Sequence, residues 1–113
     1  MNHNPKTFVL YLLIILFVLL TNISFGQITV KHFNAGWNEA NGVDWLMELK
    51  DCKTKGYVDI AKDIEAQTKY KIAVVPTIII FKDGEEVARF QADLSFTMIA
   101  TKEEVQELSL IHI

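Results

Sequence analysis

The feature that most constrains this chain is a run of β-branched and aromatic residues at positions 77–81, Thr-Ile-Ile-Ile-Phe, directly after Pro76. These side chains are stiff at the first torsion and suit a pleated surface, so the run predicts a strand buried on both faces. Pro76 has no backbone donor and pushes Val75 toward extended geometry, so the chain must bend where it enters the sheet. Residues 83–84, Asp-Gly, predict a tight hairpin into a second strand over residues 86–91.

Upstream of this hairpin, residues 28–33 alternate between apolar and polar side chains, which predicts the first strand of the domain. An irregular loop over residues 34–42 follows. We expect a helix over residues 43–53, because apolar side chains recur there on one helical face, and Gly56 is expected to end it. The residues on that face are Trp45, Leu49 and Cys52, and Asn41 or Asp44 is the expected N-cap.

Two more helices and one more strand complete the predicted order. Residues 57–61 predict a strand parallel to the first, since a helical crossover joins the two. Residues 63–70 predict a short helix with Ile64 and Tyr70 facing inward. Thr101 to Glu104 form a capping box, so the last helix is expected to begin at Lys102 and to present Val105 and Leu108 to the sheet.

An ordered set of motifs now resembles the thioredoxin family. The set comprises Phe33-x-Ala35-x-Trp37, a Lys-Tyr-x-Ile segment at residues 69–72, Val-Pro-Thr at residues 75–77 and Lys-x-Gly at residues 82–84. The resemblance covers roughly residues 28–107 and implies a cis peptide bond before Pro76. It also implies a minimal thioredoxin-like α/β fold, a four-stranded mixed sheet of order 2-1-3-4 flanked by helices. The second strand is then an exposed edge, which permits a monomer or a weak edge-strand dimer.

The family's redox motif is missing from the chain. Where similar thioredoxins carry Trp-Cys-Gly-Pro-Cys, this sequence reads Trp37-Asn38-Glu39-Ala40-Asn41. Dithiol exchange needs one thiolate to attack a disulfide and a second thiol to resolve the mixed disulfide. Asn38 and Asn41 supply neither, so we expect no catalytic residue at the motif.

Two other residues need an interpretation. The resemblance puts His32 at the place of the family's buried carboxylate, and we interpret it as a hydrogen-bonded strand residue; the alternative is a pH-sensitive contact under the loop. Cys52 is the only cysteine. We interpret it as a core residue of low reactivity, in part because the C-terminal end of its expected helix disfavours a thiolate. The alternative is a free thiol or an intermolecular link.

The resemblance also implies a binding surface. In thioredoxin-like proteins the backbone before the cis proline hydrogen-bonds an extended peptide, and the tryptophan lines the groove; this assigns Trp37, Val75 and Pro76 to peptide contact. The alternative is that Trp37 is an aromatic residue of the loop without a binding role and that Pro76 only bends the chain. Our leading hypothesis is a peptide-binding or chaperone-like module with an unknown protein partner. The alternative is an enzyme, a divergent thiol-disulfide oxidoreductase that uses Cys52. We expect no cofactor and no metal, because the spacings of metal ligands and of phosphate-binding glycine loops are absent.

The N-terminal segment predicts export. Lys6 precedes thirteen consecutive apolar residues, Phe8 to Leu20, and small residues Ser24 and Gly26 follow. This pattern is typical of a secretory signal, residues 1–26, cleaved before Gln27, which predicts a periplasmic or extracellular protein with no membrane contact after cleavage. The alternative is an uncleaved membrane anchor.

Cleavage would leave a domain at residues 27–113 and shift the formal charge from −3 to −4, since it removes one lysine. No basic stripe remains, so nucleic acid is not an expected partner. Residues 108–113 look like the translation of a sequencing-library adapter, in which case the native last helix continues with a different sequence.

Overall fold

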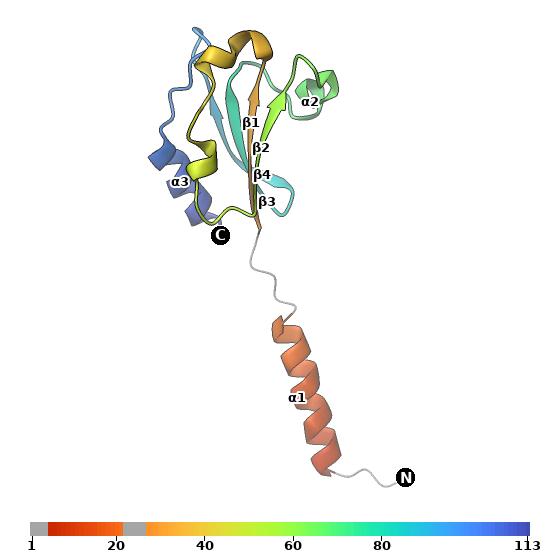
Figure 1. The fold of residues 1–113 in the computed structure, drawn as a ribbon. Helices are drawn as coiled ribbons and strands as arrows, with labels where there is room; N and C mark the ends of the chain where they lie inside the picture. The colour runs from red at the N-terminus through yellow and green to blue at the C-terminus, as the bar shows by residue number, and fades with distance from the viewer. Residues whose placement is uncertain (1–4, 22–26) are drawn as a thin grey trace.

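The computed structural model describes residues 5–21 and 27–113. Within these two ranges the chain forms three α-helices, four strands and two short 3-10 helices. Figure 1 shows their arrangement. In chain order these are α1 (Pro5–Thr21), β1 (Ile28–Asn34), η1 (Gly36–Asn41), η2 (Leu46–Glu48), β2 (Thr54–Asp59), α2 (Ile64–Lys69), β3 (Thr77–Lys82), β4 (Glu85–Gln91) and α3 (Lys102–Ile111).

The four strands form one mixed sheet of order β2-β1-β3-β4. β1 pairs in parallel with β2 and antiparallel with β3, and β3 and β4 form the antiparallel hairpin. Asp83 and Gly84 make its turn with positive φ values of 51° and 85°. The predicted sheet order and α/β class are therefore confirmed. The pairing of Phe33 with Thr77 brings the end of β1 next to the start of β3.

Each face of the sheet carries its own hydrophobic cluster, because side chains alternate along a strand. The residues of β1 illustrate the alternation: Val30 belongs to the cluster that contains Val105 of α3, and Phe33 to the cluster packed against Tyr70, just after α2. Figure 1 shows α3 and α2 on opposite sides of the strands. Of β3, Ile78, Ile79 and Ile80 are all 0% exposed, as expected for a strand covered on both faces.

The helix predicted over residues 43–53 does not form. Only the three-residue η2 lies there, and Asp51 has a positive φ of 60°. Neither proposed N-cap acts as one, and Asn41 instead donates to Asn38. Side chains from elsewhere bind this segment's backbone: Lys55 Nζ donates to the Leu49 carbonyl at 2.8 Å, and Gln106 bonds both the N–H and the carbonyl of Lys50. Tertiary contacts therefore replace helical hydrogen bonds and override the apolar spacing.

Two smaller predictions were also wrong. The second strand runs over Thr54–Asp59 rather than residues 57–61, since no helix occupies the residues before it, and Gly56 lies within the strand. Ile64 is 70% exposed, while Ala66 is buried. Asp63 caps α2 by accepting from the Ala66 N–H, so Ile64 is the first helical residue and the inward face falls on Ala66 and, four residues later, Tyr70.

The last helix begins at Lys102, as predicted. Thr101 Oγ1 accepts from the Glu104 N–H at 3.2 Å, which is the Thr101 half of the expected capping box. Val105 is 0% exposed and Leu108 packs against the same cluster, so the predicted inward face is correct.

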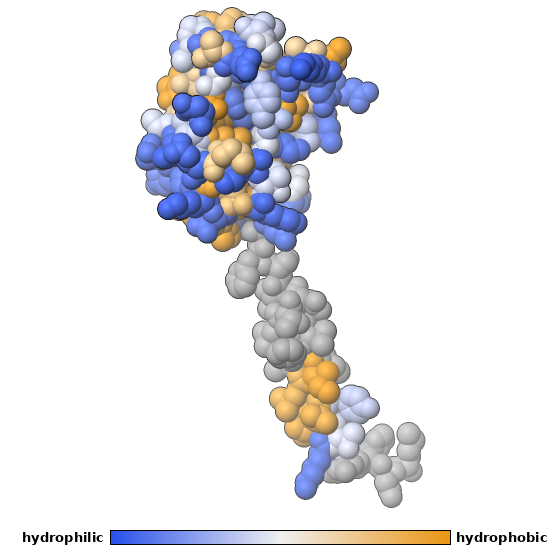
Figure 2. All heavy atoms as spheres, in the orientation of Figure 1, coloured by the Kyte–Doolittle hydropathy of each residue, from blue (hydrophilic) through white to orange (hydrophobic). Residues whose placement is uncertain are grey.

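The apolar segment at the N-terminus forms α1. Its side chains from Phe8 to Ile14 are between 51% and 63% exposed. Figure 2 shows hydrophobic residues, in orange, gathered on this segment. In the described ranges 5–21 and 27–113, no helix combines the length and the apolar content that a membrane crossing requires. The cleavage region with Ser24 and Gly26 lies outside the described residues, so the predicted signal boundary stays a prediction.

Candidate functional site

The candidate site lies where β1 ends, beside the loop that precedes β3. Asn38, the first of the two asparagines in the motif loop, is only 5% exposed. Backbone geometry explains why it points inward: η1 has a kink at Asn38, with φ −113° and ψ 19°, and its N–H donates to the Ala35 carbonyl at 2.8 Å. The turn therefore buries the amide under the loop.

Asn38 joins three separate segments through one side-chain nitrogen. Its Nδ2 donates to Asn34 Oδ1 and to the Phe96 carbonyl, both at 3.1 Å, and lies 3.5 Å from the Val75 carbonyl. These acceptors belong to the end of β1, to the loop before α3 and to the loop before β3. The amide therefore ties together the segments that surround the site.

The neighbouring amides complete this network. Asn34, 0% exposed, donates from Nδ2 to the Asn38 carbonyl at 3.1 Å, and Asn41 Nδ2 donates to Asn38 Oδ1 at 3.0 Å. Among the described residues, no buried side-chain nitrogen or oxygen lacks a hydrogen-bond partner. A buried polar network satisfied in this way makes a rigid, neutral site. Its amides do not ionise, so nothing in the network is a nucleophile.

The three residues assigned to peptide contact differ in exposure. Trp37 is 67% exposed, whereas Val75 is 3% exposed and Pro76 is fully buried. The Val75–Pro76 peptide bond is cis, and the Pro76 carbonyl accepts from the Ala92 N–H at 3.0 Å. Only Trp37 among the three therefore offers a side chain to a partner.

An aromatic partner of Trp37 was missed by the sequence analysis. Phe96 lies edge-on to Trp37, with 5.3 Å between ring centroids, and is 42% exposed. Asp93 shapes its loop by accepting three hydrogen bonds through Oδ1, from the N–H and hydroxyl of Ser95 and from the Thr97 N–H. These bonds hold the pKa of Asp93 below its usual value. No local pattern in the sequence links Phe96 to Trp37, since only the fold brings them together.

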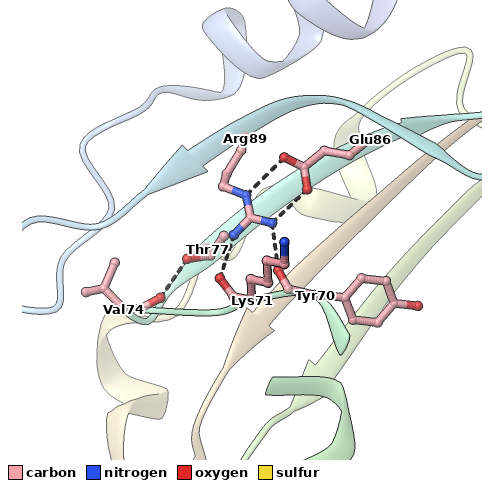
Figure 3. Close-up of polar contacts among 6 residues, drawn as sticks. All are labelled: Tyr70, Lys71, Val74, Thr77, Glu86 and Arg89. Atoms are coloured by element: carbon pink, nitrogen blue, oxygen red, sulfur yellow. Dashed lines mark hydrogen bonds and ion pairs between the residues drawn. The ribbon is translucent and has the colours of Figure 1, made fainter. Parts of the chain in front are cut away.

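A clamp from β4 holds the start of the loop that leads to Pro76. Arg89 donates to the Tyr70 carbonyl at 2.6 Å and to the Lys71 carbonyl at 2.9 Å, and pairs with Glu86 at 2.7 Å (Figure 3). At the far end of the loop, Thr77 Oγ1 donates to the Val74 carbonyl at 2.6 Å. Lys71, with a positive φ of 53°, is thereby fixed by tertiary bonds. Both ends of the loop are anchored to the sheet.

His32 lies under the motif loop and is 3% exposed. Its Nε2 accepts from the Val43 N–H at 3.4 Å, and its ring contacts Tyr57 edge-on at 5.2 Å. Burial lowers the pKa of His32 from 6.5 to about 4, so the imidazole is neutral at pH 7. A hydrogen-bonded strand residue, as expected, accounts for this position.

A cavity of about 400 Å³ opens beside His32, between β1, β2 and the irregular segment after η1. Glu39, Val43 and Tyr57 are among its lining residues. It occupies space beside the segment in which the sequence predicted a helix. Within residues 5–21 and 27–113, no group of three or more His, Cys, Asp or Glu side chains is placed to hold a metal ion.

Cys52 lies away from the motif. It precedes β2, whose Thr54 pairs with Thr29 near the start of β1, and it packs against the cluster that contains Ile28. Burial is the main cause that raises the pKa of its thiol, and Sγ lies 3.4 Å from the Lys50 carbonyl. The helix-end argument made from the sequence is wrong, since Cys52 is not in a helix, and burial opposes the thiolate instead.

These features define the class of protein: an α/β domain with a thioredoxin-like fold, with amides at the two motif positions. The sheet order, the flanking helices and solved structures of thioredoxins at probability 1.00 agree on this class. No protein family model and no curated protein sequence matches the chain.

Three solved thioredoxins illustrate the similarity. A mutant thioredoxin from Halobacterium salinarum is 21% identical with a TM-score of 0.58, covering 76% of this chain and 74% of its own. Thioredoxin from Fasciola hepatica is 25% identical with a TM-score of 0.54, covering 86% and 91%. A Nicotiana alata thioredoxin is 18% identical with a TM-score of 0.56, covering 98% and 89%. At these identities the likeness establishes the fold.

Proposed function

We propose that this protein is an exported thioredoxin-fold module without dithiol redox activity, which binds an extended peptide segment beside Trp37. The observation that carries the proposal is the hydrogen-bonding of Asn38. Its buried amide joins Asn34, the Val75 carbonyl and the Phe96 carbonyl, where dithiol exchange would need a thiolate. The network favours the interpretation of this site as a rigid binding surface rather than as a reactive centre.

The surface above this network supports the binding role. Trp37 and Phe96 form an edge-to-face pair that is largely exposed, and Leu94 on the same loop is 97% exposed. Exposed aromatic side chains fixed by neighbours supply contact area at low entropic cost, and tryptophan is the residue most enriched among binding hot spots. Asn38 and Asp93 hold the two aromatic residues' loops in place before a partner arrives.

Peptide binding is testable with a Trp37→Ala variant. On an array of extended, unstructured peptides we expect wild-type binding, and about tenfold weaker binding by Trp37→Ala because the variant loses the exposed anchor. Its unfolding free energy should change by less than about 0.5 kcal/mol, since Trp37 is 67% exposed.

Ile64→Ala is the matched control, because Ile64 is a comparably exposed apolar residue, at 70%, and is not part of the Trp37–Phe96 pair. It should bind like the wild type. Equal binding by all three proteins would contradict a role for Trp37.

The redox alternative uses Cys52 as a single thiol. Its raised pKa and its packing beside Ile28, rather than beside Val75, weigh against this role. In an insulin-reduction assay with dithiothreitol we expect the wild type to match the uncatalysed rate. Activity that disappeared in Cys52→Ser would replace the binding proposal with the enzymatic one.

Export rests on the apolar N-terminal segment. The side chains of Phe8 to Ile14 are exposed and belong to neither hydrophobic cluster of the domain, which supports a signal that is removed. N-terminal sequencing of protein recovered from the periplasm or medium should begin at Gln27. Recovery of the uncut chain in the membrane fraction would support the anchor alternative.

A further inference from the structure

The sheet face covered by α2 carries a second polar cluster, away from the Asn38 network. We propose that a phosphate-like oxyanion binds between Lys31 of β1, Lys69 of α2 and the hydroxyl of Tyr70. The three side chains, with Thr29, Phe81 and Gly84, line a cavity of about 250 Å³.

Both lysines converge on one tyrosine. Lys31 Nζ donates to Tyr70 Oη at 3.0 Å and lies 4.9 Å from the centre of the Tyr70 ring. Lys69 Nζ lies 5.1 Å from the same ring centre. Two ammonium groups that share one aromatic ring repel each other, and an anion between them relieves this repulsion.

Among the described residues, no carboxylate lies within 4.0 Å of either ammonium group. Ion pairs within 4.0 Å in the described part of the chain involve Arg89 with Glu86 and Lys102 with Glu48, and the lining of the cavity contains no acidic residue. Residues 1–26 contain no Asp or Glu at all. The cluster is therefore locally cationic on a chain whose formal charge is −3.

The direction of the pKa shift of Tyr70 indicates a positive electrostatic potential around its hydroxyl. The hydrogen bond from Lys31 is the main cause that lowers the pKa of Tyr70, and Lys69 acts in the same direction. Arg89 fixes the backbone of Tyr70 on the other side by binding its carbonyl, and Figure 3 shows the ring pointing away from that contact. The backbone of Tyr70, on whose ring both lysines converge, is therefore held by β4.

The donor set favours a doubly charged, tetrahedral anion. Two ammonium groups supply charge, and the hydroxyls of Thr29 and Tyr70 supply two further donors around one space. A phosphate dianion can accept from all of them, whereas acetate has one charge and two oxygens. We expect inorganic phosphate to bind about tenfold more tightly than acetate.

The test is a titration of the protein with inorganic phosphate at constant ionic strength, followed by NMR of the amide signals of Lys69, Tyr70 and Gly84. Lys69→Met removes one cation from an exposed position and should weaken binding about tenfold, while Lys69→Arg should retain it. Lys62→Met, which removes an exposed lysine before α2, is the matched control and should bind like the wild type.

Three outcomes of the titrations with soluble anions would overturn the site: no shift in these signals with phosphate, equal affinity for phosphate and acetate, or equal binding by Lys69→Met and Lys62→Met. A parallel titration with phosphatidic acid vesicles, whose headgroup is a phosphomonoester that can carry two charges, distinguishes a lipid headgroup from a free phosphate. Binding to vesicles without binding to inorganic phosphate would also overturn it. Trp37→Ala should leave phosphate binding unchanged, so this test is independent of the peptide-binding proposal.

Discussion

Asn38 and Cys52 lie toward opposite ends of β1. Comparing them shows that the chain has a thioredoxin-like fold while its thiol lies away from the motif position. Thr54, two residues after Cys52, pairs with Thr29, whereas Thr77, which follows Pro76, pairs with Phe33. Those two pairs are about 13 Å apart along the strand. The side chain next to the Val75–Pro76 bond is therefore the amide of Asn38, and the Cys52 thiol lies too far along β1 to reach that bond.

The two side chains also differ in how they are bound. Asn38 makes hydrogen bonds to three segments and is 5% exposed, while Cys52 is half-buried and its Sγ donates to the Lys50 carbonyl at 3.4 Å. Asn38 is therefore expected to matter for stability and Cys52 much less. The predictions below test this difference, from the largest expected effect to the smallest.

Removing the Asn38 amide should have the largest effect. Asn38→Ala leaves Asn34 Oδ1 and the Phe96 carbonyl without the donor that the Asn38 side chain supplies, so we expect the unfolding free energy to fall by about 3 kcal/mol. Urea denaturation measures the change. Glu39→Ala, at the exposed neighbouring position, is the control and should lie within about 0.5 kcal/mol of the wild type. A loss below about 1 kcal/mol for Asn38→Ala would mean that the network is not cooperative.

His32 should make stability depend on pH. Its pKa is about 4 in the folded protein against 6.5 ordinarily, so below pH 6.5 the unfolded chain binds a proton that the folded chain does not. Stability is therefore lost as the pH falls, by about 2 kcal/mol between pH 7 and pH 5. His32→Gln, which keeps an acceptor for the Val43 N–H, should remove most of this slope.

The measurement is urea denaturation at pH 5, 6 and 7. Work above pH 5 avoids the carboxyls of Glu86 and Asp93, whose lowered pKa values make them titrate in more acidic solution. An unchanged slope in His32→Gln would assign the pH dependence to other groups.

The same contrast explains how much could be predicted from the sequence. The β3–β4 hairpin was predictable because local rules fix it: β-branched residues at 77–81 and a turn pair at 83–84. The cap at Thr101 was predictable for the same reason. The segment after η1 was not, since contacts from Lys55 and Gln106 decide its conformation and both lie outside it.

The site divides along the same line. The absence of thiols at positions 38 and 41 can be predicted from the sequence, because residue type alone decides whether a side chain ionises. The hydrogen-bond partners of Asn38 cannot be predicted from the sequence. Phe96 is 58 residues away in the chain, and only the folded sheet brings its carbonyl to 3.1 Å from Asn38 Nδ2. Sequence patterns predict elements and residue chemistry; they do not predict side-chain networks across loops.

A helix cap at the start of α3 provides a reference for the size of these effects. Thr101→Ala removes the side-chain acceptor for the Glu104 N–H at the start of α3, so we expect a loss of about 1 kcal/mol in urea denaturation. Glu103→Ala, at an exposed position two residues after the cap, should lower the unfolding free energy by less than Thr101→Ala does. If Thr101→Ala cost as much as Asn38→Ala, the amide network would be worth no more than one surface cap.

Cys52 should give the smallest change in stability and a slow chemical reaction. Cys52→Ser keeps a small polar side chain beside the Lys50 carbonyl, so the unfolding free energy should fall by less than about 1 kcal/mol. Burial raises the pKa of the Cys52 thiol, so the thiolate is scarce at neutral pH and labelling by a thiol reagent should be slower than that of a free cysteine. The labelling rate should rise as the pH increases toward and beyond 9. Rapid labelling of the native protein at pH 7, with unchanged far-UV circular dichroism, would give Cys52 the reactivity that its burial is expected to suppress and would reopen the redox alternative.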